Sequence, residues 1–162
     1  MIAIALMAPT AQGGAIVLDQ AVMQELNLTL DKYLDLHASM ARGLSDEQIE
    51  IGIRDVILEL ELTRELLSRG RTPAHERGHI GRLIDAAHIH FEQAESAFGF
   101  QRQARLEDAI NDLVNFVRIF SVHSKFLIYF CERDKKSWVQ LSGRAQNPFG
   151  SDEMRNCGIK AN

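Results

Sequence analysis

The chain has 162 residues, of which 46% are apolar and 25% are charged, and this length and composition suit a single globular domain with one core. Its formal net charge of -4 argues against a broad basic surface. We therefore expect neither nucleic acid nor an anionic membrane surface as a partner.

The first 15 residues, MIAIALMAPTAQGGA, differ in character from the rest of the chain. An apolar run from Ile2 to Ala8 precedes small residues, and Gly13 and Ala15 suit the positions before a signal-peptidase cleavage site. No positively charged segment precedes the run, so residues 1–15 are either the remnant of a signal peptide or a buried N-terminal segment. We favour the signal peptide, which predicts a periplasmic or secreted protein. No other apolar stretch approaches the roughly 20 residues that span a bilayer, so we expect no membrane span in the mature chain.

Two amphipathic helices are predicted between Ile16 and Gly70. The first ends at Gly43, and the second begins at Ser45, which forms a capping box with Gln48. Apolar residues at steps of three and four place one stripe on each helix. The stripes consist of Val22, Leu26, Leu30, Tyr33, His37 and Met40, and then Ile49, Ile53, Val56, Ile57, Leu60 and Leu67.

Two further helices are predicted up to Ser124. Thr72 is the expected N-cap of the third helix, Pro73 its first residue and Gly99 its C-terminal stop, whereas the fourth has no clear N-cap. Their buried faces are Ile80, Leu83, Ile84, Ala87, Phe91, Ala94 and Phe98, and then Leu106, Ile110, Leu113, Val117 and Phe120. Four amphipathic helices joined by short turns predict an all-α fold, an antiparallel four-helix bundle.

The pattern changes in residues 125–162. The stretch KFLIYFC is typical of a short extended segment, while one proline and three glycines between residues 143 and 158 exclude a long helix. We expect an irregular C-terminal cap, with residues 16–162 forming one domain. Trp138 and Phe149 are expected to bury the cap against the bundle.

Several motifs follow one another in this tail. They are Cys131, then Trp138 and Val139, then Asn147, Pro148, Phe149 and Gly150, and finally Met154, Cys157 and Gly158. In this order the chain resembles a bacterial domain-of-unknown-function family whose tail reads Cys-Pro-Met, Trp-Leu, Asn-Pro-Tyr-Gly and Met-x-x-Cys-Gly. The resemblance extends to the helices and covers residues 20–159. Members of that family are exported proteins or are appended to membrane-fusion subunits of copper and silver efflux pumps. The resemblance implies a soft-metal role near an efflux system or another envelope protein.

The two cysteines allow three interpretations. In an oxidising compartment Cys131 and Cys157 form a disulfide that closes a loop of about 25 residues and adds roughly 3 kcal/mol. Alternatively, both thiolates and the thioether of Met154 bind copper(I) or silver(I), which prefer sulfur, with His123 as a possible fourth donor. Free or intermolecular thiols are the third alternative. Where the resembling family has Pro-Met after the first cysteine, this chain has a glutamate and Arg133, which removes a thioether and adds a cation.

Histidines elsewhere give weaker indications. Glu76 and His79 form one Glu-x-x-His motif, whereas a di-iron bundle needs two on different helices. His88 and Glu92 stand at helical spacing, which suits a zinc or copper site, but we favour a His88 that packs near the apolar stripe with a hydrogen bond. His37 is interpreted as a core residue with its hydrogen bond satisfied.

No motif indicates catalysis, and we expect the protein not to be an enzyme. The sequence has no glycine-rich phosphate loop and no nucleophile elbow. Glu107, Asp108 and Asp112 are interpreted as a solvated helix face. Two functional hypotheses follow: an exported accessory protein that binds or relays copper or silver ions, or a disulfide-fastened structural or protein-interaction module without a metal role.

Overall fold

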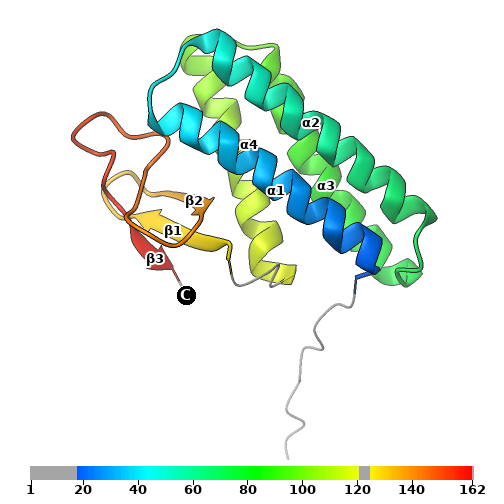
Figure 1. Cartoon of the computed structure of the whole chain (residues 1–162). Helices are drawn as coiled ribbons and strands as arrows, with labels where there is room; N and C mark the ends of the chain where they lie inside the picture. The colour runs from blue at the N-terminus through cyan, green and yellow to red at the C-terminus, as the bar shows by residue number, and fades with distance from the viewer. Residues whose placement is uncertain (1–17, 121–124, 162) are drawn as a thin grey trace, which may run out of the picture.

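The computed structural model describes residues 18–120 and 125–161, and its helices stand beside a small sheet (Figure 1). In this part of the chain the helices are α1 (Gln20–Ala41), α2 (Asp46–Arg69), α3 (Ala74–Glu95) and α4 (Gly99–Phe120), and the strands are β1 (Leu127–Cys131), β2 (Lys136–Gln140) and β3 (Ile159–Ala161). None of these four helices combines the length and the apolar character needed to cross a membrane. The proposed leader, residues 1–15, lies outside the described residues.

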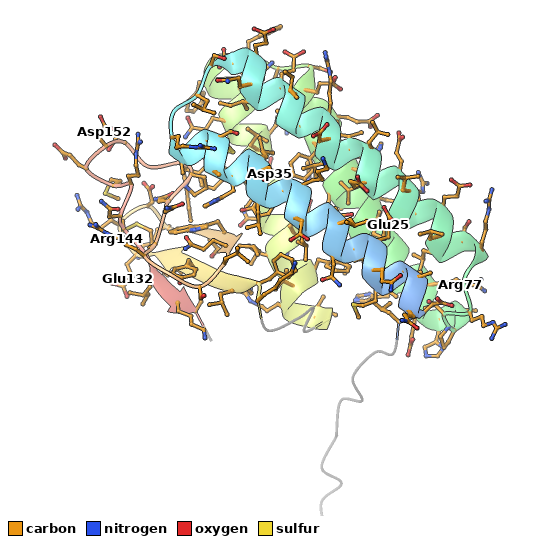
Figure 2. All side chains as sticks on the ribbon, in the orientation of Figure 1. Glu25, Asp35, Arg77, Glu132, Arg144 and Asp152 are labelled. Atoms are coloured by element: carbon orange, nitrogen blue, oxygen red, sulfur yellow. A yellow bond between two sulfur atoms is a disulfide. The ribbon has the colours of Figure 1, made fainter. Side chains whose placement is uncertain are left out.

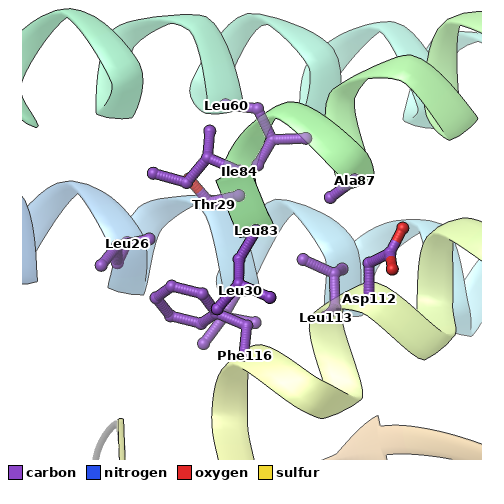
Figure 3. A pocket seen from close by; sticks show the side chains of 10 residues that line it. All are labelled: Leu26, Thr29, Leu30, Leu60, Leu83, Ile84, Ala87, Asp112, Leu113 and Phe116. Atoms are coloured by element: carbon purple, nitrogen blue, oxygen red, sulfur yellow. The ribbon is translucent and has the colours of Figure 1, made fainter. Parts of the chain in front are cut away.

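The four helices form a bundle in which each packs against the next along the chain. All four contribute side chains to its centre, among them Leu30, Leu60, Ile84 and Leu113 (Figure 3). The space left between these side chains is only about 10 Å³. That is about the volume of a single water, so the centre is a packed core with no room for a ligand.

The predicted start of α2 is confirmed. Ser45 accepts a hydrogen bond from the backbone N–H of Gln48, and the Gln48 side chain accepts one from the backbone N–H of Ser45. The preceding turn contains Gly43 with a φ of +66°, a conformation that glycine adopts without steric cost.

Two details of α3 differ from the prediction. Its N-cap is Pro73 and not Thr72, whose hydroxyl instead accepts a hydrogen bond from the backbone N–H at the start of α1. Its last residue is Glu95, so the helix stops before the apolar period reaches Phe98, and that side chain is 74% exposed rather than buried. Gly99 begins α4 and does not end α3.

The C-terminal cap is a sheet, which corrects both the all-α class and the irregular cap. The strands are antiparallel in the order β2-β1-β3, with Tyr129 of β1 opposite Trp138 on one side and Lys160 on the other. Only β1 has a marked strand composition. The strands that pair with it, β2 and β3, come from segments farther along the chain. No local sequence pattern indicates that these segments are strands.

The sheet lies beside the bundle, with β2 against α4 and α1 (Figure 1). Trp138 is completely buried there, as predicted, and its indole N–H donates to Oε1 of Gln140 at 2.8 Å. Phe149 is only half-buried and lies under the ammonium of Lys136, 5.2 Å from the ring centre. The sheet therefore extends the core of the bundle.

Candidate functional site

Cys131 is the last residue of β1 and is fully buried. A tight turn follows, in which the N–H of Lys135 donates to the carbonyl of Cys131 at 2.8 Å while Lys135 adopts a φ of 58°. The N–H of Asp134 donates to Sγ of Cys131 at 3.4 Å. The turn therefore directs a backbone N–H group toward the sulfur atom of Cys131.

Asn147 organises the return of the tail toward that turn. Its side-chain amide donates to Asp134 at 2.9 Å, and its side-chain oxygen accepts from the N–H of Phe149 at 3.0 Å. Its own backbone N–H donates to the carbonyl of Arg155 at 2.7 Å. These three contacts explain why an asparagine stands at the start of the Asn-Pro-aromatic-Gly motif, where it is almost completely buried.

Two glycines of the tail motifs are required by close packing. A Cβ at Gly150 would lie 2.7 Å from the carbonyl carbon of Met154, and a Cβ at Gly158 would lie 2.5 Å from the Trp138 ring. Gly158 also has a φ of +156°, which other residues rarely adopt. Both glycines therefore allow the segment that carries the second cysteine to lie flat against its neighbours.

The two cysteines meet, which confirms the prediction that they lie close in space. They form a disulfide with a Cα–Cα distance of 5.3 Å, within the roughly 7 Å that such a bond allows. Cys157 donates its N–H to the carbonyl of Met154 at 2.9 Å, so both residues belong to one turn, and both are half-buried. The bond joins the end of β1 to the segment just before β3. His123, the fourth candidate donor, lies outside the described residues.

The solvated face predicted on α4 is exposed only in part. Asp108 is exposed, but Glu107 forms an ion pair with Lys136 of β2. Asp112 lies 2.7 Å from Nδ1 of His90 on α3, and both side chains are largely buried. The interpretation failed because this face of α4 lies against its neighbours, and the sequence of one helix does not show what packs on it.

His37 is a satisfied core residue, as predicted. It is 3% exposed, and its Nε2 donates to the carbonyl of Gln146 at 2.8 Å. Burial lowers the pKa of His37 to about 4, an effect that the hydrogen bond to Gln146 partly opposes. The neutral ring thereby fastens the loop after β2 to α1, beside a hollow of about 310 Å³.

His88 lies 3.3 Å from a carboxylate oxygen of Glu61 and 3.4 Å from one of Glu92. His88 therefore packs in the fold with hydrogen-bonding partners, which agrees with the interpretation that we favoured. At the start of α3, Glu76 is half-buried and His79 is exposed. Within residues 18–120 and 125–161, no group of three or more His, Cys, Asp or Glu side chains is placed to hold a metal ion.

A polar seam between α1 and α2 was not predicted. The hydroxyls of Thr29 and Thr63, both buried, lie 3.1 Å apart. One turn away on α1 lies Glu25 (Figure 2). Its pKa is raised to about 7, first by burial and then by its neighbour Glu59 on α2. No spacing within either helix alone signals a contact between them.

Comparisons with known proteins identify no relative, because no protein-family model, curated protein or solved structure matches this chain. The family resemblance of the tail therefore remains a prediction from the order of its motifs.

Proposed function

We propose that the protein is an exported accessory protein that binds or relays copper(I) or silver(I) near an efflux system, through the sulfur atoms of its C-terminal tail. The observation that supports the proposal is that Cys131 and Cys157 lie close together in space. Cys157 belongs to the same turn as Met154, so a third sulfur atom lies nearby in the chain. Two thiolates and a thioether are the ligand types that soft monovalent ions prefer. An intramolecular disulfide is compatible with an extracellular compartment.

The metal-binding form requires reduction of the disulfide. A thiol or dithiol reductant supplies two electrons and two protons, the S–S bond breaks, and two thiols result. The metal then displaces the thiol protons.

The experiment is a titration of anaerobically reduced protein, purified without a histidine tag, with copper(I) against a competing chelator. We expect one ion per chain, at least about tenfold weaker binding in Met154→Leu because the volume is kept but the sulfur donor is lost, and tighter binding in Arg133→Met. Uptake no greater than that of a Cys131→Ser/Cys157→Ser control contradicts the proposal.

A second candidate is a structural or protein-interaction module in which the disulfide only fastens the tail. The complete burial of Cys131 inside the shared core of sheet and bundle favours it. Under this alternative the double serine variant loses stability while reduced wild-type protein takes up no metal. The same titration, followed by thermal unfolding of both proteins, distinguishes the two candidates.

A further inference from the structure

The two cysteines of the disulfide are buried to different degrees. Cys131 has no exposed surface and belongs to the core that the bundle and the sheet share. Cys157 is only half-buried and packs against that core. The bond therefore connects the interior of the protein with its surface, and a molecule in solution can approach it from the side of Cys157.

The topology of the sheet explains this difference. Cys131 ends β1, the central strand, which is paired on both sides, whereas Cys157 comes just before β3, an edge strand that pairs only with β1 (Figure 1). The neighbours of Cys157 in the chain are open to solvent, since Asn156 and Lys160 are exposed and Ile159 is 62% exposed. The segment around Cys157 therefore lies at the surface of the protein.

Burial decides which of the two sulfur atoms an external thiol can attack. In thiol–disulfide exchange a thiolate approaches one sulfur atom in line with the S–S bond, and the other sulfur atom leaves. In-line attack on Sγ of Cys157 comes from the surface. In-line attack on Sγ of Cys131 would have to pass through the packed core. The two ends of the bond are therefore not equivalent toward a thiol in solution.

We propose that Cys157 is the exchange site of the disulfide and that its reductant is a dithiol. One thiolate of the dithiol attacks Sγ of Cys157, the S–S bond breaks, and Cys131 leaves with the electron pair and takes up a proton. The second thiolate of the dithiol then attacks its own sulfur in the mixed disulfide, so Cys157 leaves and takes up the second proton. The chain gains two electrons and two protons, and the dithiol becomes a disulfide.

A dithiol is required because the two cysteine segments stay together after the first step. The side-chain amide of Asn147 donates to Asp134 in the turn after Cys131, and its backbone N–H donates to the carbonyl of Arg155, two residues before Cys157. The thiolate of Cys131 therefore remains beside the mixed disulfide and expels a single thiol by an intramolecular attack. The second thiol of a dithiol competes with this attack because it is tethered as well.

The inference rests on the proposed function, in which the metal binds only the reduced thiols. It deepens that function by naming the sulfur atom at which reduction begins and the chemical class of the reductant. Its test contains no metal. The inference can therefore fail while reduced protein still binds copper(I), and it can hold while reduced protein binds none.

The test is a short pulse of reduced glutathione on the oxidised wild-type chain, quenched with acid and followed by alkylation of free thiols in urea. Trypsin then separates the two cysteines into the peptides 126–133 and 156–160, which mass spectrometry tells apart. We expect glutathione on Cys157 and the alkyl group on Cys131, at least about tenfold in excess of the reverse pattern. The same pulse on the chain unfolded in urea is the control, and there the preference should disappear.

A second measurement tests the class of reductant. At equal concentrations of thiol groups, dithiothreitol should convert the folded chain to the form with two free thiols. Glutathione should leave most chains oxidised, with a small fraction of mixed disulfide on Cys157. Adducts that form on Cys131 as readily as on Cys157 in the folded chain overturn the exchange site. Complete reduction by glutathione at the rate of dithiothreitol overturns the requirement for a dithiol.

Discussion

Glu25 and His37 both lie on α1, and burial shifts their pKa values in opposite directions. The pKa of Glu25 is raised from 4.5 to about 7, so its contribution to stability is complete below pH 4.5 and is lost as the pH rises through 7. The pKa of His37 is lowered from 6.5 to about 4, so its contribution is complete above pH 6.5 and is lost as the pH falls through 4. The two residues therefore favour folding at opposite ends of the pH range.

We expect Glu25→Gln to raise the free energy of unfolding at pH 8. There the wild-type carboxylate is ionised, partly buried and next to Glu59, whereas the amide carries no charge. At pH 4 the wild-type side chain is mostly protonated in the folded and unfolded states, so the variant should differ little. Urea unfolding at both pH values measures the difference, with the exposed Glu153→Gln as control. Equal effects of Glu25→Gln at the two pH values would contradict the expectation.

Among the helices and strands, β3 has the fewest residues, so few backbone hydrogen bonds hold it in place. It has three residues and pairs only with β1, so its position depends on the disulfide just before it and on Gly158. This glycine packs directly on the ring of Trp138, the only tryptophan of the chain. A side chain at position 158 would therefore push β3 away from the sheet.

We expect Gly158→Ala to lower the free energy of unfolding by about 1–3 kcal/mol and to shift the Trp138 fluorescence to longer wavelength. Gly143→Ala is the matched control, because Gly143 has a similar positive φ of +143° but no atom lies within 4 Å of the place that an alanine methyl group would take. The control carries the backbone strain without the collision. If both variants shift the fluorescence equally, the contact with Trp138 is not the cause.

In the part of the chain that the structure describes, a helical core stands beside a sheet whose strand β2 packs mainly against α4 and, less extensively, against α1. The disulfide joins two segments of the sheet region, 26 residues apart in sequence, and does not involve the bundle. Loss of this bond should therefore loosen the tail before it affects α2 and α3.

We expect Cys131→Ser/Cys157→Ser to lose about 3 kcal/mol of stability, because the open loop gains conformational freedom in the unfolded chain. Hydrogen–deuterium exchange should speed up at β1 and β3, while α2 and α3 keep their protection. The oxidised wild-type chain under the same buffer conditions is the reference. Equal acceleration in α2 and α3 would show instead that the bond supports the entire fold.

The four helices could be predicted from the sequence alone. Their signals are local: the apolar spacing along α1 to α4, the capping box of Ser45 and the positive φ that Gly43 supplies all act within a few residues. The sequence also indicated that Cys131 and Cys157 meet, because a segment with Pro148 and several glycines that must bury Trp138 has to return to the bundle. The metal role of these sulfur atoms stays a prediction.

The remaining features depend on contacts between segments that are distant in the sequence. The sheet needs pairs such as Ile128 with Val139 and Phe130 with Ile159, and such pairing depends on partners that no local period reveals. The contact between Glu25 and Glu59 likewise requires two helices to pack in one register. Phe98 continues the apolar spacing of α3 and yet lies in solvent, since the backbone leaves the helix three residues earlier. Burial is a property of the packed chain, so a residue's spacing predicts its side of a helix only while that helix continues.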